Sequence, residues 1–208
     1  MASRIRLAVG LLSFTVIGFE LALMRILSLG FWYYFAAMVI SVALLGFGFS
    51  GTLLTLAQRR LTAQRGFWLP ALCFGTSLSI LICAAGVQHV PLDVHYLAWN
   101  PGAQWRHILA IELLMLLPFL LSGGFLGLVL MDRSSRISGH YAANLVGSGA
   151  GALVSLVLMS YVTIPGLLFV LALLSFSAGA ALTSWTNRRA VTGAVAVAAI
   201  GLAAMIFF

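Results

Sequence analysis

Long apolar runs separated by short polar breaks dominate the chain. Each run has about 20 residues, the length that an α-helix needs to cross about 30 Å of hydrocarbon. The runs do not alternate polar and apolar residues over about 10 positions, as the strands of membrane β-barrels do. The pattern predicts an all-α integral membrane protein, a single multi-pass domain over residues 1–208, with about seven transmembrane helices: Leu7–Leu29, Tyr34–Leu56, Phe67–Val90, Ile108–Met131, Tyr141–Met159, Ile164–Ser184 and Ala190–Phe208.

The last run is unusual because no polar residues follow it. The stretch "GAVAVAAIGLAAMIFF" ends within hydrophobic sequence. We therefore expect either that the protein ends at the outer membrane surface or that this chain is one part of a longer polypeptide.

Composition agrees with a membrane protein, and the charges predict its orientation. Of the 208 residues, 62% are hydrophobic and 7% are charged, whereas a soluble domain has about 25% charged residues. The net charge of +7 comes from arginines, which in a soluble protein would suggest nucleic-acid binding. Here nine of them fall on one side of the predicted membrane: Arg4, Arg6, Arg59, Arg60, Arg65, Arg133, Arg136, Arg188 and Arg189. The positive-inside rule then predicts a cytoplasmic N-terminus and an external C-terminus, and no nucleic-acid partner.

Three charged residues lie inside the predicted helices. A charge at the centre of a bilayer costs at least about 2.5–3.5 kcal/mol on insertion scales. Arg25 lies near the outer end of the first helix, and Glu112 lies at a similar depth in the fourth. Glu20 is about 7.5 Å deeper than Arg25, at 1.5 Å per residue. We expect an Arg25–Glu112 ion pair, and Glu20 nearer the midplane either assists helix association or binds a proton, a cation or an amine.

Small residues recur at spacings that let membrane helices approach closely. Asn144 is expected to form hydrogen bonds within a helix–helix contact, and Pro118 is expected to bend the fourth helix, with Ser122 helping to satisfy the freed backbone. The segments "LLGFGFSGTLLTLAQRR" and "LLSGGFLGLVLMDRSSR" are alike and share orientation, which hints at a parallel internal repeat. The predicted helix-packing glycines are Gly46, Gly48, Gly51, Gly123, Gly127, Gly147 and Gly151.

No catalytic or metal-binding motif is visible in the sequence. The longest predicted external loop and its edges hold four possible ligands, His89, Asp93, His95 and His107. Their spacing matches no closed zinc pattern, so we expect neither a metal nor a cofactor. No Ser-His-Asp, HExxH or CxxCH arrangement occurs, and the two cysteines read as packing residues.

Three segments carry a family resemblance. "GFELALMRILSLGFWYYFAAMVISVALLGFGFSGTLL", "LPFLLSGGFLGLVL" and "YAANLVGSGAGALV" resemble the N-terminal membrane region of bacterial spermidine synthase-like proteins, in which a multi-spanning domain precedes an aminopropyltransferase-type domain. The resemblance covers roughly Gly18 to Val154 and includes the E-x-x-x-x-R pattern of the first helix. It implies a multi-pass protein of the bacterial inner membrane linked to polyamine or S-adenosylmethionine chemistry.

The chain departs from that family in one respect. The enzyme half of such proteins needs a nucleotide-binding domain with acidic residues for the amine substrates, but this chain has four acidic residues in total and no room for such a domain. Catalysis would therefore need a further domain or subunit. Three functions remain open. The chain could be a membrane module that anchors a soluble aminopropyltransferase-like domain or supplies it with substrate. It could also be a transporter of a small cation such as a polyamine, or a structural subunit that packs against other membrane subunits in the lipid bilayer.

Overall fold

The computed structural model describes residues 2–30, 34–90, 101–131 and 137–183. Six long α-helices account for nearly all of these residues: α1 (Ala2–Gly30), α2 (Tyr34–Ala63), α3 (Arg65–His89), α5 (Pro101–Leu130), α6 (Ile137–Leu158) and α7 (Ile164–Leu182).

All six helices are long and apolar enough to cross a membrane. Helices satisfy their backbone hydrogen bonds internally, which a membrane interior without water requires. The first six predicted runs are confirmed as helices, with ends that differ by a few residues. The largest differences are in α2, which continues to Ala63, and in α5, which begins at Pro101. The seventh predicted span, Ala190–Phe208, lies outside the described residues, so the structure fits a multi-pass membrane protein without deciding the total number of spans.

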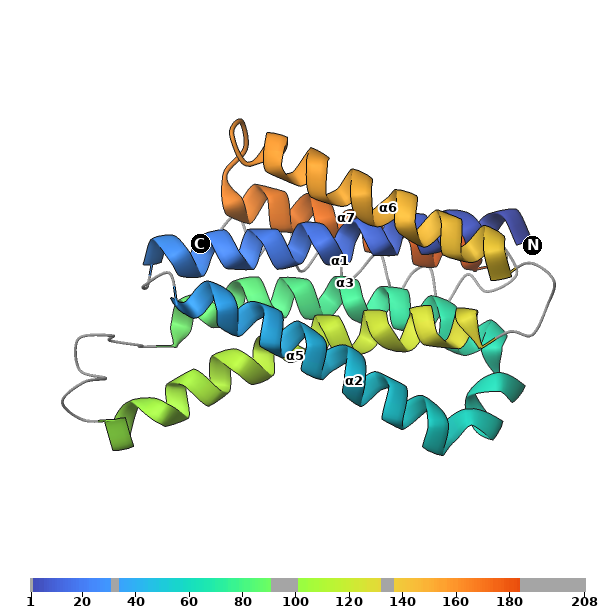
Figure 1. Cartoon of the computed structure of the whole chain (residues 1–208), viewed down its shortest axis with the longest axis horizontal. Helices are drawn as coiled ribbons and strands as arrows, with labels where there is room; N and C mark the ends of the chain where they lie inside the picture. The colour runs from blue at the N-terminus through green and yellow to red at the C-terminus, as the bar shows by residue number, and fades with distance from the viewer. Residues whose placement is uncertain (1, 31–33, 91–100, 132–136, 184–208) are drawn as a thin grey trace.

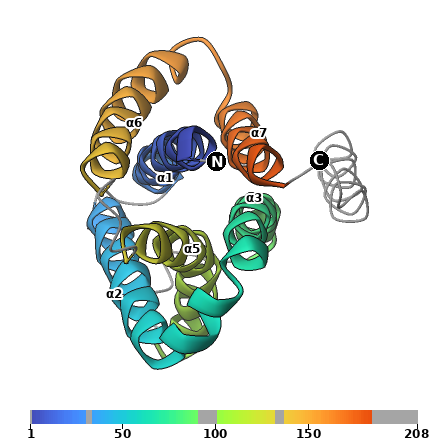
Figure 2. The same ribbon diagram turned by 90° about the vertical axis from the view of Figure 1, so that its right-hand side faces the viewer.

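The helices form two rows of three, which Figure 2 shows end-on. In one row α1 packs between α6 and α7, and in the other α5 packs between α2 and α3. The contact between α3 and α7 joins the rows along one side, and α1 also contacts α2 and α5. Neighbours in the chain run in opposite directions, so the loops fall at the two ends of the bundle (Figure 1).

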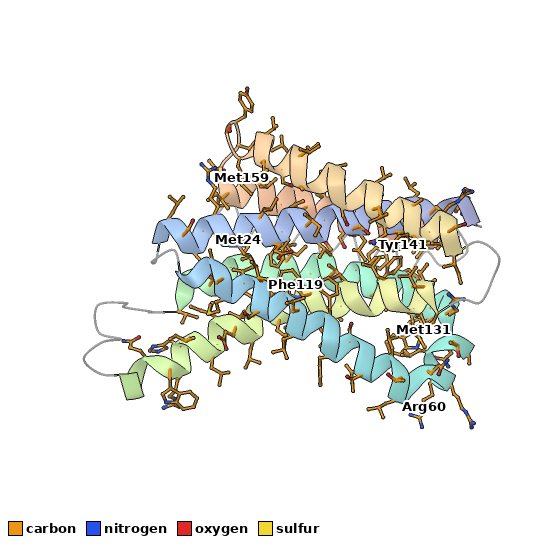
Figure 3. All side chains as sticks on the ribbon, viewed as in Figure 1. Met24, Arg60, Phe119, Met131, Tyr141 and Met159 are labelled. Carbon is orange, nitrogen blue, oxygen red and sulfur yellow. The ribbon has the colours of Figure 1, made fainter. Side chains whose placement is uncertain are left out.

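Three aromatic rings pack together at the centre of the bundle. Phe119 of α5 is fully buried and lies at the middle of the molecule (Figure 3). Its ring centroid is 5.4 Å from that of Phe19 on α1 and 6.2 Å from that of Phe47 on α2. These tilted contacts join helices of both rows at one level and fix α1 against α5 there.

The helix α5 changes direction near its middle (Figure 1), where Pro118 removes one backbone donor. The hydroxyl of Ser122 donates to the carbonyls of Pro118 at 2.7 Å and Phe119 at 3.1 Å. The carbonyl that Pro118 leaves without its helical donor is that of Leu114, one turn earlier. Ser122 therefore reinforces the turn after the proline, which differs from the compensating role expected from the sequence.

Candidate functional site

Glu20 lies near the middle of α1 and is half-buried. The preceding residue, Phe19, packs its ring on that of Phe119 of α5. Within the described part of the chain, no arginine or histidine forms an ion pair with its carboxylate. A carboxylate at this position in a membrane helix is costly unless it is protonated or meets a cation, so it is the first candidate for function.

A polar contact lies two turns from Glu20 along the same helix. The buried hydroxyl of Ser13 is 2.7 Å from Asn144 Oδ1 of α6 and 2.7 Å from the carbonyl of Val9. Its single hydrogen is shared between these two acceptors. The structure thus places Asn144 in the contact between α1 and α6, with Ser13 as its partner.

Ser13 and Glu20 lie on the same side of α1. Seven residues are almost two helical turns, so their directions differ by about 20° and they are about 10.5 Å apart along the axis. That side of α1 carries a hydroxyl, an amide partner from α6 and a carboxylate. Sequence reasoning singled out Glu20 and Asn144 but missed Ser13, although its seven-residue spacing from Glu20 was a visible signal.

The Arg25–Glu112 ion pair expected from the sequence is not formed between these two described residues. Arg25 is exposed and Glu112 is half-buried. The helices α1 and α5 meet at the Phe19–Phe119 ring contact, about two turns deeper than Glu112. Before the bend near Pro118, the first half of α5 diverges from α1 (Figure 1). Equal depth in the membrane therefore did not bring the two charges together.

The predicted packing glycines of α6 face α1 directly. A Cβ added to Gly151 would lie 2.6 Å from the carbonyl oxygen of Phe14, and a Cβ on Gly147 would overlap the backbone of Gly10. Only hydrogen fits at these two positions. The α1–α6 contact is therefore a close approach of backbones, which places Asn144 within reach of Ser13.

Glycines also line the contact between α2 and α5. A Cβ added to Gly46 would lie 2.7 Å from Phe119 Cβ, and one on Gly123 would lie 2.6 Å from Ser50 Oγ. Gly127 approaches the side chain of Leu54 just as closely. These three predicted packing residues therefore lie in a single helix–helix contact.

Two other glycines predicted to pack do not do so in the described structure. Gly48 and Gly51 lie on the exposed side of α2, and a Cβ added to either would meet no other atom within 4 Å. The sequence could not separate them from Gly46, because all three stand in one glycine-rich stretch of α2.

A metal centre gains no support from the described residues. In that part of the chain, no group of three or more His, Cys, Asp or Glu side chains could hold a metal ion. Of the four candidate ligands, Asp93 and His95 lie outside the described residues.

No known protein family, no curated protein and no solved structure matches this chain. Any function must therefore be argued from the chain's own residues and their arrangement.

Proposed function

We propose that this chain is the integral membrane module of a bacterial spermidine synthase-like protein, set in the inner membrane. It would anchor a soluble aminopropyltransferase-type domain or supply that domain with substrate. The supporting observation is that two of the segments carrying the resemblance, those of α2 and α5, pack on one another. Gly46 of α2 packs on Phe119 of α5, and Gly123 of α5 packs on Ser50 of α2. The glycines of these two segments thus form one of the contacts that build the bundle.

The interior of the bundle suits a stable platform. Among the described residues, the buried polar side chains are serines, threonines and one histidine, with no buried carboxylate or guanidinium. Several hydroxyls bond to backbone carbonyls, as those of Thr76 and Ser79 do. Such an interior costs little in lipid.

The test is to purify the chain from its native membrane in mild detergent and assay aminopropyl transfer. The assay supplies decarboxylated S-adenosylmethionine and putrescine. We expect the activity to co-purify with the chain, in a species whose intact mass exceeds 22.2 kDa. Membranes from a strain lacking the chain serve as the control and should lose the activity to the soluble fraction. A purified species of 22.2 kDa with no associated activity would overturn the proposal.

A second function, transport of a small cation such as a polyamine, has one specific observation in its favour. Glu20 is half-buried near the middle of α1, on the side where Ser13 meets Asn144. Intramembrane carboxylates commonly mark cation or proton pathways.

Uptake of radiolabelled putrescine into liposomes tests the transport function. We expect uptake by the wild-type chain and its loss in the Glu20→Gln variant, since the substitution removes the counter-charge while keeping the side-chain size. Glu112→Gln is the matched control, because Glu112 is also half-buried but lies on α5, away from the Ser13–Asn144 contact. Equal uptake by the two variants would count against a transport role for Glu20.

A further inference from the structure

One face of α1 is covered by α6 only along the first half of the helix. On this face Gly10 lies against Gly147 of α6, and further along α1 Gly18 lies against Ser155 of α6. An α-helix turns by about 80° beyond two full turns between positions 10 and 18. The helix α6 therefore moves off the face that holds Gly10, and this face continues towards the C-terminal end of α1 without α6 over it.

The continuation of this face is a strip of four residues: Ile17, Leu21, Met24 and Ser28. Because Ile17 follows Gly10 by almost two full turns, both residues lie on the same face. The first three residues of the strip are half-buried and Ser28 is exposed, and Figure 3 shows Met24 in the second half of α1. Their alternating spacing of four and three residues is that of the a and d positions where one helix packs along another.

Two charged residues flank this strip. Glu20 and Arg25 point about 140° apart on α1, so one lies on each side of the strip. With Leu21 at an a position and Met24 at a d position, Glu20 takes the g position before them and Arg25 takes the e position after them. Charges at g and e positions pair between the two helices of a coiled coil.

A twofold axis along the membrane normal makes this arrangement complementary to itself. Copies of one membrane protein insert with the same orientation, so their α1 helices run parallel. When two such strips face each other, the twofold rotation brings Glu20 of each copy to the side that holds Arg25 of the other. Both ion pairs then form at once, as an interface between identical surfaces requires.

Within the described part of a single chain, no ion pair joins Glu20 or Arg25 to another side chain. On the side of the strip, α1 lies between α6 and α2 (Figure 2), so it is set back from the surface of the bundle. Long side chains suit such a contact, and the side chain of Arg25 is exposed and free to extend from it.

We propose that this chain forms a parallel homodimer through the strip on α1, in which Glu20 of each copy pairs with Arg25 of the other. The pairing neutralises both charges within protein, as intramembrane charges require. It also accounts for their spacing of five residues, which is unsuited to a pair on one helix surface, where partners are three or four residues apart. The dimer concerns assembly and is independent of both functions proposed above.

Cross-linking in isolated membranes tests the dimer. Ser28→Cys places a thiol at the exposed end of the strip, and we expect bismaleimidohexane to give a product of twice 22.2 kDa on a denaturing gel. The matched control is Thr163→Cys, an equally exposed position at the start of α7, a helix that meets α1 through Thr15 on the other side. The control should give severalfold less product. The native thiols of Cys73 and Cys83 are fully buried.

Charge exchange in the Ser28→Cys background tests the ion pairs. Glu20→Arg and Arg25→Glu each place like charges on facing sides, so each variant alone should cross-link severalfold less than the parent. Expressed together with different tags, the two variants should cross-link to each other, because each carries the charge that the other has lost. Recovery in the mixture also shows that both variants fold.

Equal cross-linking of Ser28→Cys and Thr163→Cys would overturn the dimer, and a product whose mass is not twice that of the chain would overturn a second copy as the partner. Neutral substitutions keep the ion pairs open to refutation where an exchanged charge prevents folding. Glu20→Gln and Arg25→Gln add no charge to the membrane and should each lower cross-linking severalfold. Unchanged cross-linking in both would overturn the pairing.

Discussion

At the residue scale, some hydroxyl groups bond only within their own helix, whereas others reach a neighbouring helix. Thr52 and Thr55 bond to carbonyls one turn back on α2, which only makes a hydroxyl tolerable in lipid. Ser77 and Ser175 instead bond to carbonyls of the neighbouring helix. Ser155 does neither, since its buried Oγ has no hydrogen-bond partner among the described residues.

This difference predicts opposite effects of two alanine substitutions. Ser155→Ala should leave stability unchanged or raise it by up to about 1 kcal/mol, because it removes an unsatisfied buried group. Ser175→Ala should lower stability by about 0.6 kcal/mol, the average for interhelical hydrogen bonds in membranes. Unfolding in mixed micelles by denaturant titration measures both, and a stability loss in Ser155→Ala equal to that in Ser175→Ala would show that Ser155 is satisfied after all.

At the element scale, glycines decide how closely helices approach. The helix α6 exposes most of its large apolar side chains, such as Val146 and Leu153, yet its glycines Gly147 and Gly151 press against the α1 backbone. Its neighbouring glycine, Gly149, has no other atom within 4 Å of an added Cβ. One helix therefore holds both essential and dispensable glycines two residues apart.

This contrast predicts the outcome of two leucine substitutions. Gly147→Leu should destabilise the protein by about 3 kcal/mol or more, because its Cβ meets the backbone of Gly10, which cannot rotate away. Gly149→Leu should be neutral, since the side chain points into open space and leucine favours helix. The yield of monodisperse protein and its thermal unfolding midpoint measure the difference. A similar midpoint for both variants would contradict the observed α1–α6 contact.

The side chain of Arg65 stabilises the C-terminal end of the helix α5. Arg65, at the start of α3, donates from its guanidinium to the carbonyl of Leu128 at 2.7 Å, near the C-terminus of α5. A positive charge there satisfies a free carbonyl and offsets the negative end of the helix dipole. By contrast Arg60 extends from the end of α2 away from the bundle (Figure 3).

At the scale of the whole molecule, charge asymmetry predicts orientation. Arg4, Arg6, Arg60 and Arg65 all lie at the end of the bundle that holds the N-terminus (Figure 1). The positive-inside rule then predicts that this end faces the cytoplasm. The opposite end, which holds the turn between α6 and α7, should face outside.

Cysteine labelling with a membrane-impermeant maleimide tests this orientation. In intact spheroplasts we expect Tyr161→Cys to react and Ser3→Cys to react only after the membrane is opened, because both positions are exposed but lie at opposite ends. The wild-type chain is the control, since its own thiols, Cys73 and Cys83, are fully buried. The reverse pattern of labelling would invert the topology.

The positions of the helices follow from the pattern of apolar residues along the chain. Any segment that crosses hydrocarbon must satisfy its own backbone, so an apolar run of about 20 residues has only one regular structure open to it. The first six runs therefore became helices close to where the pattern predicted them. The same reasoning flagged Glu20 and Asn144, because polar groups are conspicuous in such runs.

Which sides of the helices meet follows from their packing in three dimensions and not from the pattern. In water an apolar stripe marks the inward face, but lipid is as apolar as the helix surface, so the pattern carries no such mark. For that reason Gly48 and Gly147 looked equivalent in sequence but differ in the bundle, and Arg25 and Glu112 share a depth without pairing.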